Sequence, residues 1–449
     1  LLSPCGLWNG SYKAYKSFIS SYGVLQTVYL SALNSNMPYA VESLFNYYEK
    51  FIGDFKDNAI RIFGCNGIFV PAIISPNTGR VGSTSVTVLN FTASAAWLSL
   101  LFFKYYERTG NIKFLKRLLP FMKETANFYE DFFKKSADGS YIISPSCLPM
   151  APEDEVKQKD RPVISKNSAL DFQIARNFFR ALIKASADGK MYQRDVDRWR
   201  EIASNLPENQ TNSEGYFKEF INCMVAMDYT GISNGTLFGA YFGNDINFLS
   251  RKETSELYIL TADHKLNNAG KETSFNMAVL ASVYARLEQT EKAETCLTNV
   301  IRGCAMNNLA LTEKDWRGMG VCGSGVWIPT QLQSNIAVTN AIGQMLLFCE
   351  GNIIKIMPCE VAEWEDISVK NFLTSCGAEV SYNFTKKTET LYVEVKAMRD
   401  TCFDLYLPNV VKKLLKSNVA EKLDSDVYKC VKEIKLANGK TANFLLKTK

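Results

Sequence analysis

A long succession of helix-forming segments is the feature that most constrains how this chain folds. From about residue 35 to about residue 350, apolar residues recur at helical spacing, and Gly, Pro, Asn and Asp separate the runs. Gly110 is a helix stop because glycine readily adopts the left-handed conformation that ends a helix. We predict helices over residues 95–109, 112–133, 169–187, 194–204, 216–227, 274–287, 291–304 and 335–348.

Paired helices over some 300 residues are typical of either an α/α toroid or a helical solenoid. The sequence contains no strict repeat of 34 or 40 residues, which favours the toroid. A toroid closes on itself and gathers its loops at one rim, where they form a cup for a ligand. The predicted fold class is therefore mainly α.

The pattern changes after Gly351, where strand-like segments begin. Apolar and polar residues then alternate with a period of two, as in strands with one buried face. We predict strands over residues 352–358, 378–384, 391–395, 402–407 and 431–436. The expected organisation is a toroid over residues 1–350 followed by a small antiparallel β domain over residues 351–449.

The composition of the chain limits the classes of function that it can have. The 449 residues are 47% hydrophobic and 22% charged, with a net charge of +5, as in an ordinary globular protein. No basic stripe stands out, so we predict no nucleic-acid partner. No apolar run reaches the roughly 18–20 residues of a membrane span, so none is predicted. The chain starts at Leu1, which is compatible with a trimmed product, and an extracytoplasmic or secreted location is favoured.

Metal and cofactor sites have little support in the sequence. The single histidine, His264, lies in a polar stretch and is interpreted as a solvated loop residue. The twelve cysteines include no Cys-x-x-Cys pair, and their irregular spacing favours buried free thiols. We predict no metal and no other cofactor.

A proline-rich loop between two predicted helices carries the most interesting carboxylate. Pro145, Pro149 and Pro152 precede Glu153, and each proline fixes one backbone angle and stiffens the loop. A stiff loop between rigid helices can aim an acid at a substrate. The alternative interpretation is a surface loop with a solvated glutamate.

Several motifs, taken in order, resemble glycoside hydrolase family 95, the inverting α-L-fucosidases and α-L-galactosidases with an (α/α)6 barrel. The similar segments are Gly6-Leu7-Trp8-Asn9, Ala95-Ala96-Trp97-Leu98, Ser144-Pro145-Ser146 with Pro152-Glu153-Asp154, Leu237-Phe238-Gly239 and Gln331-Leu332-Gln333-Ser334-Asn335. The resemblance spans nearly the whole chain, but the family's N-terminal β-sandwich has no counterpart here. It implies an (α/α)6 toroid that acts on α-linked sugars of an oligosaccharide or glycan by inversion.

The resemblance assigns the general acid to Glu153, with Glu155 as a rival because an insertion blurs the register. The rest of the family's catalytic set is changed. Its two catalytic asparagines align with Tyr22 and Val24, its polarising aspartate with Gln333, and its paired histidines with Ser233 and Thr236. Valine cannot orient water, and a neutral glutamine cannot polarise an amide as a carboxylate does.

Inverting hydrolysis needs a base as well as an acid. Asp315 is the best replacement, because it lies on a loop before the last predicted barrel helix, beside a tryptophan able to stack on a sugar. The alternative is a charged turn in which the tryptophan caps the core. The predicted substrate-binding residues are Trp8, Asn9, Trp316, Gln333 and Asn335.

Two functional hypotheses follow. The first is a fucosidase-like glycoside hydrolase with Glu153 as the acid. The second is a catalytically inactive relative that binds glycans or acts as a scaffold, because the family's base is replaced. An unrelated helical toroid such as a lyase is a third interpretation, but no Asp-Asp-x-x-Asp metal motif supports the terpenoid class.

Overall fold

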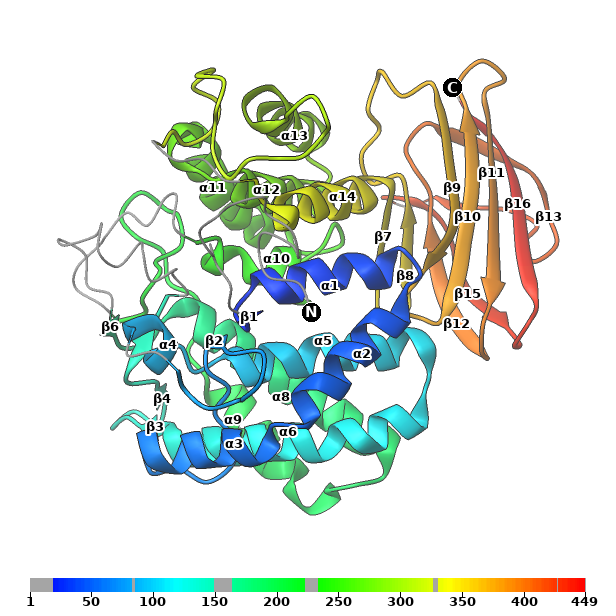
Figure 1. Cartoon of the computed structure of the whole chain (residues 1–449). Helices are drawn as coiled ribbons and strands as arrows, with labels where there is room; N and C mark the ends of the chain where they lie inside the picture. Colours follow the sequence, from blue (N-terminus) through cyan, green and yellow to red (C-terminus); the bar gives the residue numbers. More distant parts are fainter. Residues whose placement is uncertain are drawn as a thin grey trace.

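The computed structural model describes residues 19–82, 85–148, 164–222, 233–325, 330–425 and 427–448. A helical part and a β part pack against each other (Figure 1). Each part has its own apolar core, one within the helices and one between the strands.

Six helices of the described chain contact one another in a closed ring. Each touches the next, and the last touches the first. The ring consists of α1 (Val24–Asn34), α5 (Ser94–Thr109), α8 (Ala169–Gly189), α10 (Phe238–Tyr241), α12 (Ser274–Arg286) and α14 (Leu332–Leu346). The predicted (α/α)6 toroid is thereby confirmed.

The remaining helices lie outside this ring, and the sequence explains which helices take which place. In α5 every residue from Ser94 to Tyr105 is buried, as in a helix packed on all sides. In α6 (Ile112–Phe132) one apolar face is buried and the other face is polar. The longer outer helices are α2 (Pro38–Glu49), α3 (Ile52–Asn58), α6, α9 (Val196–Asn205), α11 (Lys252–Asn267) and α13 (Thr290–Cys304). Shorter ones are η1 (Ala59–Phe63), α4 (Val86–Asn90), η2 (Gln193–Asp195), η3 (Gly235–Leu237) and η4 (Ala269–Lys271).

The turn between α5 and α6 confirms the predicted helix stop. Gly110 caps α5 in the left-handed conformation, with φ of 65°. The next residue, Asn111, begins α6, and its side-chain oxygen accepts a hydrogen bond from the Phe114 N–H at 3.1 Å.

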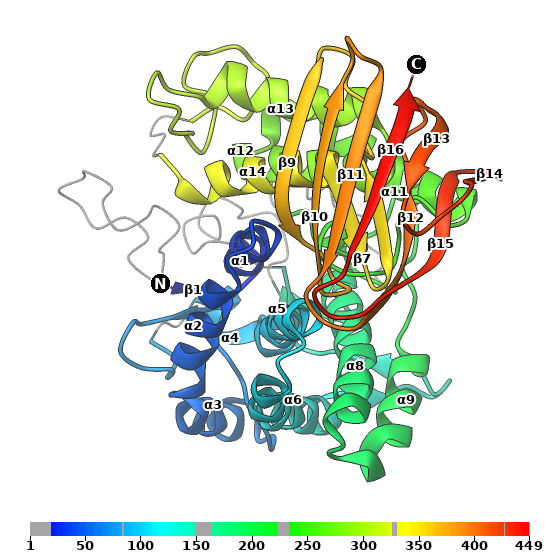
Figure 2. The same ribbon diagram turned by 90° about the vertical axis from the view of Figure 1, so that its right-hand side faces the viewer.

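The β part contains two five-stranded sheets in the orders β13-β16-β11-β10-β9 and β14-β15-β12-β8-β7. Figure 2 shows β9, β10, β11 and β16 side by side. The strands are β7 (Leu347–Glu350), β8 (Ile353–Ile356), β9 (Asp366–Leu373), β10 (Ala378–Thr385), β11 (Thr390–Ala397), β12 (Thr401–Tyr406), β13 (Val411–Ser417), β14 (Asp424–Ser425), β15 (Lys429–Leu436) and β16 (Thr441–Thr448). All pairs are antiparallel except β12 with β8, which is parallel. The predicted antiparallel domain is thus confirmed with one exception, and a division near residue 351 stays a prediction.

Buried charges join the two parts at the C-terminal ends of the inner helices. Lys355 of β8 is 1% exposed, and its Nζ lies 2.7 Å from Oε1 of Glu288, just beyond α12. The Tyr428 hydroxyl donates to the other oxygen of Glu288 at 2.9 Å. Lys104 of α5 pairs with Glu350 of β7 at 3.2 Å. The β part therefore covers one end of the ring, and the N-terminal ends of the inner helices lie at the other.

Two local predictions are wrong. The described part of the helix predicted over residues 216–227 is irregular, because its backbone pairs with distant segments. There the Ile221 N–H donates to Asn167 O at 2.8 Å, and Glu219 O accepts from the Ala169 N–H at 2.8 Å. His264 lies on α11 rather than in a loop, and its ring stacks on Tyr216 with centroids 4.1 Å apart.

Two further findings concern the membrane and the thiols. No helix among the described residues has the length and apolar character needed to cross a bilayer. The described cysteines are free, and all of them except Cys402 are buried, as the sequence predicted.

Candidate active site

Buried polar atoms without a partner gather where the inner helices begin. Their hydrogen-bonding capacity is unmet by any atom of the described protein, and buried polar groups are normally satisfied by protein, water or ligand. The residues concerned are Ser20, Gln26, Thr92, Ser94, Trp97, Ser168, Asp171, Asn234, Thr236, Gln331 and Gln333. We call this set the polar rim. Its atoms come from the first turns of α1, α5, α8 and α14 and from the segments that lead into the inner helices.

Asp171 is the most distinctive carboxylate of the polar rim. It lies in the first turn of α8, is 1% exposed, and its Oδ2 is 2.5 Å from the Ser146 Oγ. The Ser146 Oγ also accepts the Ser168 N–H at 3.0 Å, so its single proton is available for Asp171. The other oxygen, Oδ1, has no hydrogen-bond partner among the described residues.

Burial raises the pKa of Asp171 from 3.8 to about 7, and the bond from Ser146 acts in the opposite direction. The Tyr129 hydroxyl is near this carboxylate, and burial raises its pKa well above the usual value. Asp171 therefore changes charge near neutral pH.

Two short paired strands fix both ends of the segment that carries Glu153. Strand β5 (Ser146–Cys147) pairs with β6 (Ile164–Ser165), with Ser146 opposite Ser165. Because Ser146 bonds Asp171, this strand pair is held at the start of α8, beside the polar rim. Glu153 and its rival Glu155 themselves lie outside the described residues, as do Trp8 and Asn9.

Asp315, the predicted base, is buried in a tight turn of the loop between α13 and α14. Its Oδ1 accepts the Arg317 N–H at 2.9 Å, and its Oδ2 accepts the Gly320 N–H at 2.7 Å. Its own N–H donates to Gly323 O at 2.8 Å. These bonds shape the loop, while each oxygen keeps a further lone pair. The role of Asp315 as the base stays a prediction.

The other predicted sugar-binding residues differ in their surroundings. Trp316 is 46% exposed, and the Arg317 guanidinium lies 5.1 Å from the centroid of its ring. The side-chain amide of Asn335 bonds to the preceding loop. It accepts the Leu311 N–H at 3.0 Å and donates to Leu309 O at 2.8 Å. Trp316 is thus available to a ligand, and Asn335 supports the loop.

Gln333 forms a pair with Gln331 that sequence reasoning did not foresee. Its Nε2 donates to the Gln331 Oε1 at 2.6 Å, and both side chains are buried. The Gln333 Oε1 and the Gln331 Nε2 have no hydrogen-bond partner among the described residues. One acceptor and one donor are therefore left side by side, which suits a sugar hydroxyl because it both donates and accepts.

The positions that align with the family's other catalytic residues have changed chemistry. Tyr22 is half-buried, with its ring edge toward Phe91, and Val24 is the first residue of α1. The Ser233 Oγ accepts the Gly235 N–H at 2.9 Å. Thr236 belongs to the polar rim, because its hydroxyl has no partner among the described residues.

Sequence reasoning also missed a buried ion pair beside these residues. Glu272 is fully buried just before α12, and Lys265 of α11 lies 4.0 Å from its Oε1. The Lys265 Nζ donates to Ser233 O at 2.6 Å, and Asn276 donates to the Glu272 Oε2 at 2.9 Å. This pair therefore holds in place the segments that lead into the inner helices α10 and α12.

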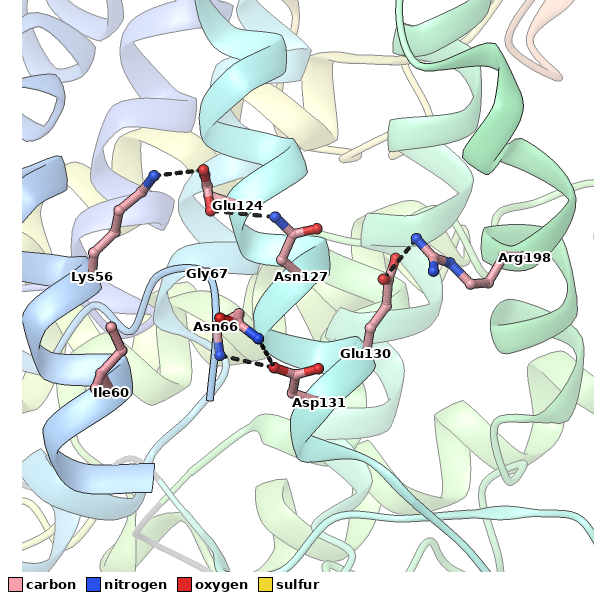
Figure 3. Close-up of a pocket in the computed structure, with 9 residues that line it drawn as sticks. All are labelled: Lys56, Ile60, Asn66, Gly67, Glu124, Asn127, Glu130, Asp131 and Arg198. Atoms are coloured by element: carbon pink, nitrogen blue, oxygen red, sulfur yellow. Dashed lines mark hydrogen bonds and ion pairs between the residues drawn. The ribbon is translucent and has the colours of Figure 1, made fainter. Parts of the chain in front are cut away.

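A hollow of about 500 Å³, away from the polar rim, lies among α3, η1, α6 and α9 (Figure 3). Both of its cations are already paired with carboxylates. Lys56 pairs with Glu124 at 2.6 Å, and Arg198 with Glu130 at 2.8 Å. Asp131 accepts two hydrogen bonds from Asn66. Because its polar groups are satisfied, this hollow is a weaker candidate than the polar rim.

A ring of six inner helices with a polar rim at one end and a β domain at the other defines the class of (α/α)6 toroids. The model of the glycosyl hydrolase family 95 catalytic domain matches residues 5–346, and the chain belongs to that family. A comparison with curated protein sequences finds no match.

Solved structures share the fold at low identity. A candidate kojibiose phosphorylase from the human microbiome has a TM-score of 0.63 at 11% identity, covering 90% of this chain and 54% of its own. The chain thus spans about half the length of that protein. The Streptomyces avermitilis α-L-rhamnosidase complexed with L-rhamnose has a TM-score of 0.50 at 11% identity, covering 94% of this chain and 38% of its own. A wild-type glycosidase has a TM-score of 0.50 at 10% identity, covering 76% and 91%.

Proposed function

We propose that the chain hydrolyses a glycosidic bond of an α-linked, fucose-like sugar in a glycan, with inversion and with Glu153 as the general acid. The observation that carries this proposal is the polar rim, where unpaired buried donors and acceptors of a family 95 domain meet at one end of the toroid. A sugar with several hydroxyl groups satisfies such a set better than an apolar ligand does.

The anchoring of the segment between β5 and β6 supports Glu153 as the acid. The described ends of this segment are tied to α8 through Ser146 and Asp171. Both described ends of this segment therefore lie beside the polar rim. The acid donates a proton to the leaving oxygen, and the base takes one from water on the opposite face of the sugar.

Asp315 is the proposed base, and its two bonds to backbone N–H groups keep its carboxylate oriented. In an inverting enzyme the acid and the base are roughly 6.5–9.5 Å apart. Trp316, the exposed neighbour of Asp315, supplies a face on which a pyranose ring can stack.

The test measures turnover of aryl α-L-fucosides, α-L-galactosides and α-L-rhamnosides by the full chain. We expect Glu153→Gln to lower turnover about 100-fold or more, the usual effect of removing a general acid. Glu155→Gln is the matched control, because it changes the same side chain two positions away and leaves turnover near that of the unmodified chain. Equal losses in both variants would refute the assignment of Glu153.

The anomer of the released sugar, read by NMR in the first minutes, tests inversion. Asp315→Gly is then assayed with and without azide, a small nucleophile able to replace activated water. We expect azide to restore turnover as a glycosyl azide. Each reaction is run with and without inorganic phosphate, because turnover that requires phosphate contradicts hydrolysis and indicates phosphorolysis.

A glycan-binding protein without turnover is the second candidate. It is favoured by Val24 and Gln333 at positions where the resemblance expects catalytic residues. Calorimetry with the free sugars separates the two. Binding that Glu153→Gln leaves unchanged, together with no turnover of any glycoside, favours this candidate over hydrolysis.

A further inference from the structure

Two buried cysteines meet where the loop after α13 folds back on its helix. Cys304 is the last residue of α13, and Cys322 lies near the end of the described part of the loop. Their side chains are 0% and 2% exposed, and the two thiols lie close enough for each to shift the pKa of the other.

The backbone on both sides of this contact is fixed. The Trp316 N–H donates to Gly303 O at 3.2 Å, and the Asp315 N–H donates to Gly323 O at 2.8 Å. A Cβ atom placed on Gly303 would lie 3.1 Å from the Val321 Cγ2. The residues that precede the two cysteines, Gly303 and Val321, are therefore in contact, which places the backbone of Cys304 beside that of Cys322.

The two thiols differ in reactivity. The interaction with Cys322 lowers the pKa of the Cys304 thiol, whereas the same interaction, together with burial, raises the pKa of Cys322. Since the thiolate is the attacking species in disulfide exchange, Cys304 is the first nucleophile and Cys322 the second.

We propose that Cys304 and Cys322 are a redox pair that closes into a disulfide across the base of this loop. The oxidant is a small disulfide such as oxidised glutathione. The Cys304 thiolate attacks it and releases one thiolate, and the Cys322 thiolate then displaces the second. Two protein S–H bonds are lost, one S–S bond forms, and the oxidant leaves as two thiols.

The bridge encloses the loop that carries two of the predicted site residues. It spans 322 − 304 = 18 positions, including Asp315 and Trp316. Residues 316–320 are exposed, so local opening of this stretch gives an oxidant access to the buried pair. Closing the bridge restricts that opening, and the inference does not depend on the proposed hydrolysis.

The experiment compares the full chain after oxidised glutathione and after dithiothreitol, each denatured, alkylated and digested for mass spectrometry. We expect a cross-linked peptide joining residues 304 and 322 only in the oxidised sample, in which these two thiols are no longer alkylated. Cys304→Ser and Cys322→Ser each abolish it. Cys296→Ser is the matched control, because Cys296 is a buried cysteine of the same helix and its loss leaves the cross-link intact.

Trypsin gives an independent readout. Cleavage after the exposed Arg317, between the two cysteines, leaves fragments that stay joined on a non-reducing gel only if the bridge exists. Full alkylation of both cysteines after oxidation would overturn the proposal, as would a cross-link from Cys296 to Cys322. Circular dichroism of each serine variant verifies that it has folded.

Discussion

Burial changes the pKa of the Asp171 carboxyl by a large amount. Asp171 lies in the first turn of the inner helix α8 and is fully buried. Its pKa is about 7 because burial disfavours the charged form. Its only described hydrogen-bond partner is a serine 25 positions earlier in the chain. This carboxylate links the start of α8 to the strand pair that frames the predicted acid.

The raised pKa of Asp171 makes the free energy of unfolding depend on pH in a definite direction. As pH rises from about 4 to about 7, the unfolded chain loses the Asp171 proton while the folded chain keeps it, so this residue's contribution to stability falls. We expect Asp171→Asn to gain stability relative to the unmodified chain across this window, by about 1.4 kcal/mol per unit of pKa shift and on the order of 4 kcal/mol at most. Urea unfolding at pH 4, 5.5, 7 and 8 measures the difference.

Ser146→Ala is the informative companion variant. It removes the bond that opposes burial, so the upper limit of the window should rise while the lower limit, set by the unfolded chain, stays near pH 4. A stability difference between Asp171→Asn and the unmodified chain that is constant with pH would contradict the titration of Asp171.

At the scale of elements, Gly23 and Trp97 explain how α1 and α5 approach each other. Gly23 precedes α1 with φ of 59°, and a Cβ atom there would lie 2.8 Å from the Trp97 Cη2. Trp97 is 1% exposed, with its ring edge-on to Phe238 and Phe242. The glycine is therefore required both by its backbone angle and by the indole beside it.

We expect Gly23→Ala to destabilise the fold more than Gly64→Ala. Gly64 also has positive φ, 66°, but a Cβ atom there would meet nothing within 4 Å. Gly64→Ala should cost about 1 kcal/mol for the backbone alone, and Gly23→Ala a further 1–3 kcal/mol, roughly, for overpacking. Chemical denaturation measures the free energy of unfolding of both variants. Equal losses would show that the Trp97 indole moves aside without destabilising the fold.

The helices and loops also show how much of the fold could be predicted from the sequence. The end of α5 was predictable because Gly110 acts through its own backbone, and the side chain of Asn111 caps α6 through an equally local bond. The segment after Tyr216 was not, because its pairing partners, Asn167 and Ser168, lie some 50 residues away. Gln333 was a predicted site residue, but its pairing with Gln331 was missed for a similar reason, since only the folded ring shows which of their atoms lack partners.

At the scale of the whole molecule, a buried charge pair connects the toroid to the β domain. Lys355 is almost fully buried, with its ammonium 4.2 Å from the centroid of the Tyr428 ring and 4.9 Å from that of Phe248. Its counter-ion is Glu288, at the end of the inner helix α12. Each part of the molecule thus supplies one charge.

We expect Glu288→Gln to destabilise the chain by about 3–5 kcal/mol, because Lys355 is then buried without a counter-ion. Adding Lys355→Met should recover most of the loss. Glu389→Gln breaks the exposed pair with Lys447 and should change little, which makes it the control. Calorimetry reads all three, and a Glu288→Gln transition identical to that of the unmodified chain would contradict a role for this pair.

Closure of the ring has a consequence for how the chain is made. The Asn34 amide donates to the Asn340 side chain at 3.0 Å, so the first and the last inner helices bond across 306 positions of sequence. During synthesis α1 must wait, with one flank uncovered, until α14 has emerged from the ribosome. Contacts between such distant residues form slowly, so we expect closure of the ring to be a late step in folding.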